Sequence, residues 1–159
     1  MSISIIAVGR MKEKPYRAMA DEYLKRLSRY GRFEEIELPD LPEPQNASPA
    51  QEKQLRQREG EAILQRLRPG VHVIALTIPG KQWDSPGLAR HLDGLLSRGA
   101  SDIAFVIGGS LGLHNSVCKR ADLALSFSKM TFPHQLMRVI LCEQIYRAFR
   151  IIQHEPYHK

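Results

Sequence analysis

Disulfide frameworks, membrane spans and secretion signals leave marks that this sequence lacks. Cysteine occurs only at Cys118 and Cys142, too few for a disulfide framework or a thiolate metal site, so we expect two reduced thiols. No apolar run reaches the roughly 18 to 20 residues that a membrane span requires. The start, MSISIIAVGRMKEK, has a very short apolar run and no small-residue cleavage site, which is not typical of a signal peptide. These absences predict a cytoplasmic protein that does not contact a membrane.

Motifs for metal ions and for common nucleotides are also missing. The tail HEPYHK places His154 and His158 four residues apart, but no third or fourth ligand stands at a recognisable spacing, so we expect no metal site. The first predicted strand leads into VGRMKEK, not into the G-x-G-x-x-G of dinucleotide-binding folds. The glycine-rich stretch IGGSLG, residues 107–112, is not followed by Gly-Lys-Ser/Thr and is therefore no P-loop.

The charge of the chain is positive and unevenly distributed. The formal net charge is +6; residues 1–32 hold eight Lys or Arg against three acids, whereas residues 33–52 hold six acids and no Lys or Arg. A basic excess of this kind favours a phosphate-rich partner, so we predict that the N-terminal block binds nucleic acid while the acidic segment faces away from it. The alternative that stays open is a solvated helix face.

Apolar periodicity predicts strands and helices in alternation. Predicted strands cover residues 3–8, 33–38, 71–76, 103–107 and 123–126, and predicted helices cover 16–30, 50–68, 85–99, 116–121 and 133–152. Between them, the proline-rich residues 39–49 predict a surface loop, and Ser85 is the expected N-cap of the helix that follows it. This alternation predicts one α/β domain, residues 1–159, with a mostly parallel sheet flanked by helices.

Three loops in the second half follow predicted strands: residues 76–80, 108–112 and 127–132. Ligands of parallel sheets bind beyond the carboxyl ends of the strands, so the three loops converge on one crevice if their strands are neighbours. Apolar walls would come from Leu76, Ile78, Leu111, Leu113, Met130 and Phe132. The alternative is that the glycines only shape turns.

The last predicted helix is apolar around most of its circumference. Such a helix has to be buried on more than one face. The sheet can cover one face, and a second copy of the protein is the obvious cover for another, so we expect a homodimer. Complete burial within one monomer is the alternative.

Four segments together resemble the ribosomal RNA large subunit methyltransferase H family, a branch of the SPOUT methyltransferase superfamily. They are LTIPGK, FVIGGSLGL, LSFSKMTFPHQLMRVILCEQIYRAF and the terminal PYHK, and the similarity covers essentially the whole chain. The resemblance implies an α/β fold with a C-terminal trefoil knot and a homodimer that binds S-adenosyl-L-methionine. The implied reaction is methyl transfer to N3 of a pseudouridine in a stem-loop of 23S rRNA.

The resemblance also implies roles for particular residues. The implied cofactor contacts are Leu76, Gly108, Phe127, Ser128, Lys129, Met130, Thr131 and Phe132. On this basis we expect His158, with Tyr157, at the target base, and Arg138, His134 and the N-terminal cations on RNA phosphates. Because the chain is short and has no separate RNA-binding domain, we expect it to act on the assembled ribosome. A non-catalytic ribosome-binding factor and a SPOUT enzyme for another RNA nucleotide are the alternatives.

Overall fold

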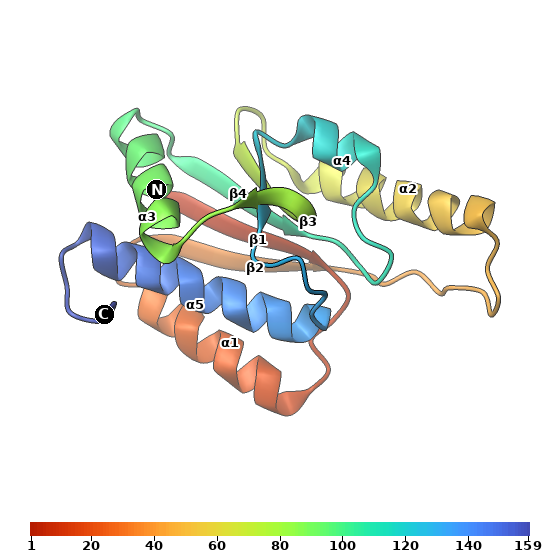
Figure 1. Ribbon diagram of the computed structural model, residues 1–159, viewed down its shortest axis with the longest axis horizontal. Helices are drawn as coiled ribbons and strands as arrows, with labels where there is room; N and C mark the ends of the chain where they lie inside the picture. The colour runs from red at the N-terminus through yellow and green to blue at the C-terminus, as the bar shows by residue number, and fades with distance from the viewer.

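The computed structural model describes residues 1–159 as a parallel sheet between two layers of helices (Figure 1). The elements are β1 (Ser2–Val8), α1 (Lys14–Leu27), β2 (Arg32–Leu38), α2 (Pro49–Arg66), β3 (His72–Gln82), α3 (Ser85–Ser97), β4 (Asp102–Ile107), α4 (Asn115–Arg120), β5 (Leu123–Ser126) and α5 (His134–Ile152). All neighbouring strands pair in parallel, in the order β2-β1-β4-β3-β5. The predicted fold class is confirmed, while the trefoil knot stays a prediction.

Both faces of the central strands are apolar and covered. Alternate residues of β1 and β4 pack toward the layer of α1, α3 and α5, and the residues between them pack toward α2 and α4. The first set is Ile3, Ile5, Ala7, Ile103, Phe105 and Ile107; the second is Ile6, Val8, Ala104 and Val106. Burial on both faces explains why these strands read as continuous apolar runs, which is typical of parallel sheets.

The third strand is longer than the sequence predicts. Leu76 and Lys81 both pair with Leu125 of β5, so the four residues between them, 77–80, have no partner in the ladder. The strand then resumes as far as Gln82, although the sequence predicts a linker there. Gly80 is what permits this path, because a Cβ at that position would lie 2.8 Å from the carbonyl group of Ala124.

The N-cap of α3 is Asp84, and the prediction of Ser85 is wrong by one residue. The Asp84 carboxylate accepts a hydrogen bond from the Gly87 N–H at 2.7 Å. Ser85 is already helical, and its hydroxyl donates instead to Gln144 Oε1 of α5 at 2.7 Å. The carboxylate, one position earlier, takes the cap because it reaches the free N–H of the first turn.

Helix α5 lies beside α1 and α3 on one face of the sheet (Figure 1). Its inward residues are buried, but several apolar side chains on other faces of the helix are only half-buried in the single chain. These half-buried residues are Leu136, Met137 and Ile140, whereas Ile151 and Ile152 pack against the core. The predicted homodimer would cover such a surface, and it stays a prediction. No helix of the structure is both long and apolar enough to span a bilayer.

The cap gives a direct test of the corrected helix start. Because its carboxylate satisfies a backbone N–H, we expect Asp84→Ala to lower the free energy of unfolding by about 1 kcal/mol, measured by urea denaturation. Asp93→Ala, at an exposed position of the same helix, is the control, with an expected change below about 0.5 kcal/mol. Equal effects of the two substitutions would contradict the assigned cap.

Candidate functional site

Two of the three predicted loops follow the ends of β4 and β5, and the third, residues 77–80, is the unpaired part of β3 between them. Strands β4, β3 and β5 are parallel neighbours, so residues 108–112, 77–80 and 127–132 all lie at the carboxyl edge of the same part of the sheet. After β4 the chain turns to α4 on one face, whereas after β3 it turns to α3 on the other. Such a topological switch point is where parallel α/β sheets bind ligands. The predicted neighbourhood of the three strands is confirmed.

The glycine loop, defined here as residues 108–112, is a tight turn that packs on itself. The Gly112 N–H donates to the Gly109 carbonyl at 3.0 Å, and Gly112 has a φ of +80°, which favours glycine. A Cβ on Gly108 would lie 2.8 Å from the carbonyl carbon of Gly112. The glycines therefore have a folding role of their own, whatever the loop binds.

The loop after β5, residues 127–132, is held by two serine hydroxyls. Ser126 Oγ donates to the Ser128 carbonyl, and Ser128 Oγ accepts from the Met130 N–H, each at 3.0 Å. This turn leaves the Met130 side chain 73% exposed, and Ile78 on the neighbouring loop is 48% exposed. Two large apolar side chains left open on adjacent loops are typical of a surface that binds a ligand or a partner.

The C-terminal tail folds back onto the second half of α5, away from these loops. Tyr157 donates a hydrogen bond to Glu143 Oε1 at 3.1 Å and packs edge-on against Tyr146, while His158 Nδ1 lies 3.3 Å from Arg147. These helix positions are roughly 14 to 20 Å along the axis from the first residue of α5. No hydrogen bond or ion pair joins the tail to the three loops. The structure thus does not bring Tyr157 and His158 to the candidate cofactor site of their own chain.

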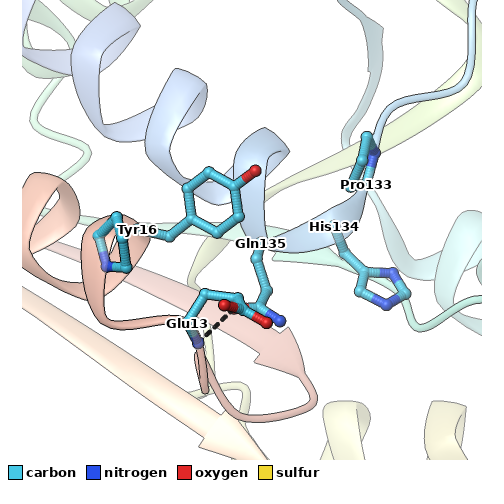
Figure 2. Close-up of a pocket in the computed structure, with 6 residues that line it drawn as sticks. Glu13, Tyr16, Pro133, His134 and Gln135 are labelled. Atoms are coloured by element: carbon cyan, nitrogen blue, oxygen red, sulfur yellow. Dashed lines mark hydrogen bonds between the residues drawn. The ribbon is translucent and has the colours of Figure 1, made fainter.

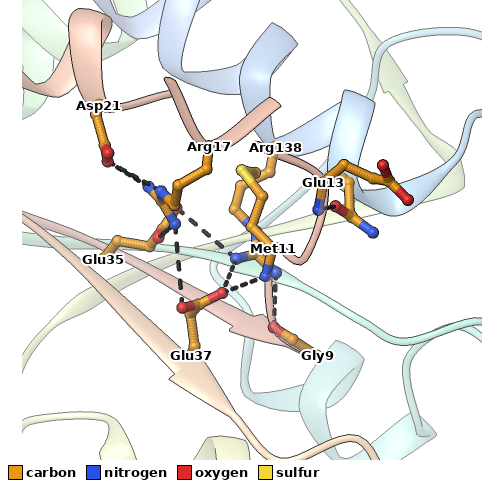
Figure 3. Close-up of polar contacts among 9 residues, drawn as sticks. Gly9, Met11, Glu13, Arg17, Asp21, Glu35, Glu37 and Arg138 are labelled. Atoms are coloured by element: carbon orange, nitrogen blue, oxygen red, sulfur yellow. Dashed lines mark hydrogen bonds and ion pairs between the residues drawn. The ribbon is translucent and has the colours of Figure 1, made fainter. Parts of the chain in front are cut away.

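Arg138 is a buried structural residue, and the prediction that it contacts RNA phosphates is wrong (Figure 3). It is 1% exposed, and its guanidinium donates to Glu37 Oε2 at 2.7 Å and to the Gly9 carbonyl at 2.8 Å. Glu37 Oε2 also accepts from the Met11 N–H at 2.7 Å. Burial by itself raises the pKa of Glu37, but these hydrogen bonds and the nearby arginines more than compensate and hold it below its ordinary value.

The predicted separation of basic and acidic segments is also wrong. Arg17 pairs with Glu35 at 2.5 Å, and Arg32 pairs with Glu34 at 3.4 Å, so acids of β2 neutralise cations of the N-terminal block. Glu35 and Glu37 are two residues apart in a strand and therefore point to the same face, where Arg17 and Arg138 pair with them. That spacing of acids was the available signal that buried cations had to face them. Ion pairs also occupy Arg26 and Arg29.

The cations without an ion-pair partner include Arg10, Lys12 and Lys14, in and just after the loop between β1 and α1. Next to them lies a surface cavity of about 530 Å³ between the starts of α1 and α5 (Figure 2). A hydrogen bond of 3.1 Å from the Glu13 N–H to Gln135 Oε1 joins its two sides. The cavity is lined by Glu13, Pro15, Tyr16, Pro133, His134 and Gln135. His134 thus lines this cavity, immediately after the loop of residues 127–132.

Glu59, a buried residue at this edge, was not predicted from the sequence. Glu59 lies in the polar stretch QREGE of α2, where nothing in the pattern marks a buried position, yet its carboxyl group packs against Gly109. Metal ligands are not grouped anywhere in the structure: no three His, Cys, Asp or Glu side chains are arranged to hold an ion.

Comparison with known proteins identifies the class. A family model described as a predicted SPOUT methyltransferase matches residues 1–158, and the chain belongs to this family. A probable methylase family protein from Haemophilus influenzae has a TM-score of 0.51 at 13% identity, covering 99% of this chain and 70% of that one. A putative methylase family protein from Neisseria gonorrhoeae has a TM-score of 0.50 at 13% identity, covering 91% and 81%. At such low identity these likenesses show the fold alone.

Relatives of higher sequence identity show which SPOUT methyltransferase family the chain belongs to. The ribosomal RNA large subunit methyltransferase H of an Exiguobacterium species is 57% identical over 159 residues, with 100% of both chains covered. The proteins of the same name from Bacillus cytotoxicus and Alkaliphilus oremlandii are 56% and 54% identical, also over their full lengths. Within the SPOUT methyltransferases, the chain therefore belongs to the ribosomal RNA large subunit methyltransferase H family.

The buried pair at Arg138 yields a test with a pH signature. We expect Glu37→Gln to lower the free energy of unfolding by about 2 kcal/mol near pH 7, because the guanidinium loses its charged hydrogen-bond acceptor at 2.7 Å and keeps only Glu35, at 3.8 Å, as a countercharge. The pKa of Glu37 is lower in the folded than in the unfolded chain, so the wild-type advantage exists above the ordinary value of 4.5 and disappears as the pH falls through the folded value. Urea denaturation across this range measures both effects.

Glu22→Gln is the matched control, because the Glu22 to Arg26 pair is exposed on α1. Its expected cost is below about 0.5 kcal/mol. A difference between wild type and Glu37→Gln that did not shrink in acid would contradict the assigned charge of Glu37.

Proposed function

We propose that the protein uses S-adenosyl-L-methionine to methylate 23S rRNA at N3 of a pseudouridine, on the assembled ribosome in the cytoplasm. The observation that carries this proposal is that three segments of the family resemblance lie together at the carboxyl edge of adjacent strands β4, β3 and β5. The name shared by relatives more than 50% identical supports the large-subunit rRNA as substrate.

The proposed cofactor contacts fit the residues present. They are Leu76, Gly108 and the loop Phe127, Ser128, Lys129, Met130, Thr131 and Phe132. These positions offer backbone groups, the exposed Met130 side chain and a single charged residue, which suits a nucleoside and a sulfonium better than a polyphosphate. When bound, S-adenosyl-L-methionine supplies an electrophilic methyl group, and the loops hold it for in-line attack.

The proposed chemistry of the tail follows from the two side chains it carries. An N3 nitrogen has to lose its proton as the methyl group arrives, and the imidazole of His158 is a side chain of the kind that serves most often as a general base. Burial and the hydrogen bond to Glu143 raise the pKa of Tyr157 to about 12 in this conformation. To donate to a base oxygen as negative charge develops there, the Tyr157 hydroxyl has to leave Glu143, and it keeps its proton near neutral pH because the ordinary pKa of tyrosine is 10.

The tail is proposed to act in the partner subunit of a homodimer. Within one chain, Tyr157 and His158 pack beside Glu143 and Arg147 and do not contact the three loops. The half-buried apolar residues of α5 offer a surface on which a second copy could pack. Two α5 helices packed antiparallel would carry each tail toward the loops that precede the other helix.

The proposed RNA surface is the carboxyl edge next to the cofactor loops. His134 lines the cavity between α1 and α5, and the unpaired Arg10, Lys12 and Lys14 stand beside it. Cations without an acidic partner are free to meet phosphates, which the paired arginines of α1 are not. A surface of this small size supports recognition of a structured ribosomal surface and not of naked RNA.

Calorimetric titration with S-adenosyl-L-methionine tests the enzyme against the ribosome-binding factor, since only the enzyme requires cofactor binding. We expect wild type to bind and Gly108→Val to fold but lose binding at least tenfold, because the added side chain meets the Gly112 backbone and distorts the glycine loop. Gly94→Ala in α3 is the control and should bind as wild type. If S-adenosyl-L-methionine did not bind to the wild-type protein, the proposed enzymatic function would be refuted. Mass spectrometry of methylated rRNA would identify the nucleotide that is modified.

Co-expression of two inactive variants tests the exchange of tails. One variant lacks residues 157–159 and the other carries Gly108→Val, and both are purified together through different tags. If each tail serves the other subunit, one site of the mixed dimer is intact, and we expect about half of the wild-type activity per purified mixed dimer on ribosomes. If tails act within their own chain, both sites of the mixed dimer are damaged and it stays inactive.

A further inference from the structure

Glu59 of α2 is a buried carboxyl group directly beside the glycine loop. The residue is 7% exposed, and its Oε2 atom has no hydrogen-bond partner. The position that a Cβ on Gly109 would occupy lies 2.8 Å from Oε2 and 3.4 Å from Oε1. The carboxyl group therefore fills the space that a side chain at position 109 would take, and it contacts the loop from the α2 side.

The helix that carries Glu59 is held close to the segment after the glycine loop. A Cβ on Gly60 would lie 3.1 Å from His114 Cβ and 3.3 Å from Val117 Cγ2, at and inside α4. His114 is itself fixed, because its Nδ1 accepts from the Ser116 N–H at 3.2 Å. Adjacent residues of α2 thus contact both ends of the segment from Gly109 to α4, and these contacts fix the backbone that carries Glu59 relative to the loop.

The electrostatic surroundings of Glu59 offer it no countercharge. The charged groups that act on it are Asp40 and Glu43, both in the proline-rich loop after β2 and both negative, while α4 presents His114 to the neighbouring Gly60. Burial, followed by these two acids, raises the pKa of Glu59 to about 7. A buried, unpaired acid is costly for a fold, so its position under a candidate ligand loop calls for a function.

We propose that Glu59 is a positioning residue of the cofactor site, whose neutral carboxyl group supports the glycine loop at Gly109 and keeps Gly108 in place for the cofactor. The role rests on the proposed function of this loop. Ionisation puts an uncompensated charge between the loop and two other acids, and hydration of that charge requires the loop to move away. The supported loop is therefore favoured at low pH and is lost as the pH rises through about 7.

The test compares Glu59→Gln, which is neutral at every pH and similar in shape, with Glu59→Ala, which leaves a space under Gly109. Glu61→Gln, at an exposed position of the same helix, is the control. Hydrogen exchange of the Gly112 amide, which is bonded within the loop, reports support of the loop without any cofactor. Calorimetry with S-adenosyl-L-methionine at pH 6 and pH 8 reports the site.

We expect wild type and Glu61→Gln to lose about tenfold in cofactor affinity and in Gly112 protection from pH 6 to pH 8, because only the neutral carboxyl supports the loop. Glu59→Gln should bind the cofactor with the same affinity at pH 8 as at pH 6. Because this variant cannot ionise at position 59, any change in its affinity measures titration of the cofactor itself. Glu59→Ala should be weaker at both values. The same pH dependence in wild type and Glu59→Gln, or unchanged binding by Glu59→Ala, would overturn the proposal. Absence of cofactor binding in wild type would instead refute the proposed function, with loop protection still testing the support by Glu59.

Discussion

The geometry of the carboxyl edge depends on the buried hydrogen bonds of Arg138. From the start of α5, this guanidinium reaches Glu37 at the end of β2 and the carbonyl of Gly9 just after β1, partners 101 and 129 residues away in the sequence. These contacts determine where α5 begins, and so where residues 127–132 and His134 lie relative to the first half of the chain. A buried ion pair seldom adds stability over apolar packing, but it satisfies only one geometry. We therefore infer that the main contribution of the Arg138–Glu37 pair is to position α5, and not to stabilise the fold.

Those parts of the fold that depend on local pattern were predictable from the sequence. The predicted strand at 123–126 has its observed bounds, and the three loops were predicted to converge if their strands are neighbours, a condition that only the strand order of the structure supplies. The extension of β3 was not predictable, because residues 77–80 leave the ladder and return only when β5 is present to pair with Lys81. Arg138 and Glu59 were missed for a related reason. A single charged residue in a helix is usually solvated, and only tertiary contacts show that these two are buried.

The glycine loop satisfies two demands with the same residues. Gly112 needs a left-handed backbone, and Gly108 needs the absence of a Cβ for the loop to close on itself. A loop closed in this way exposes backbone groups at a fixed position, which is what a site for a nucleoside requires. The sequence left open whether the glycines form a turn or bind a ligand. The two roles are compatible, because the turn is the means by which backbone groups would be presented to a ligand.

One chain supplies the components of the proposed site in two places that do not meet. The loops lie before α5, and the tail packs against the second half of that helix, where Glu143 and Arg147 already occupy the polar atoms of Tyr157 and His158. Lengthening or unfolding α5 in order to join them would expose the buried face that packs on α1 and α3. The proposed homodimer, with a twofold axis across α5, would resolve the conflict without unfolding, since it would bring a second tail to the loops and cover the half-buried apolar residues of the helix. In such an assembly, the apolar surface that makes the dimer stable is also what makes the site complete.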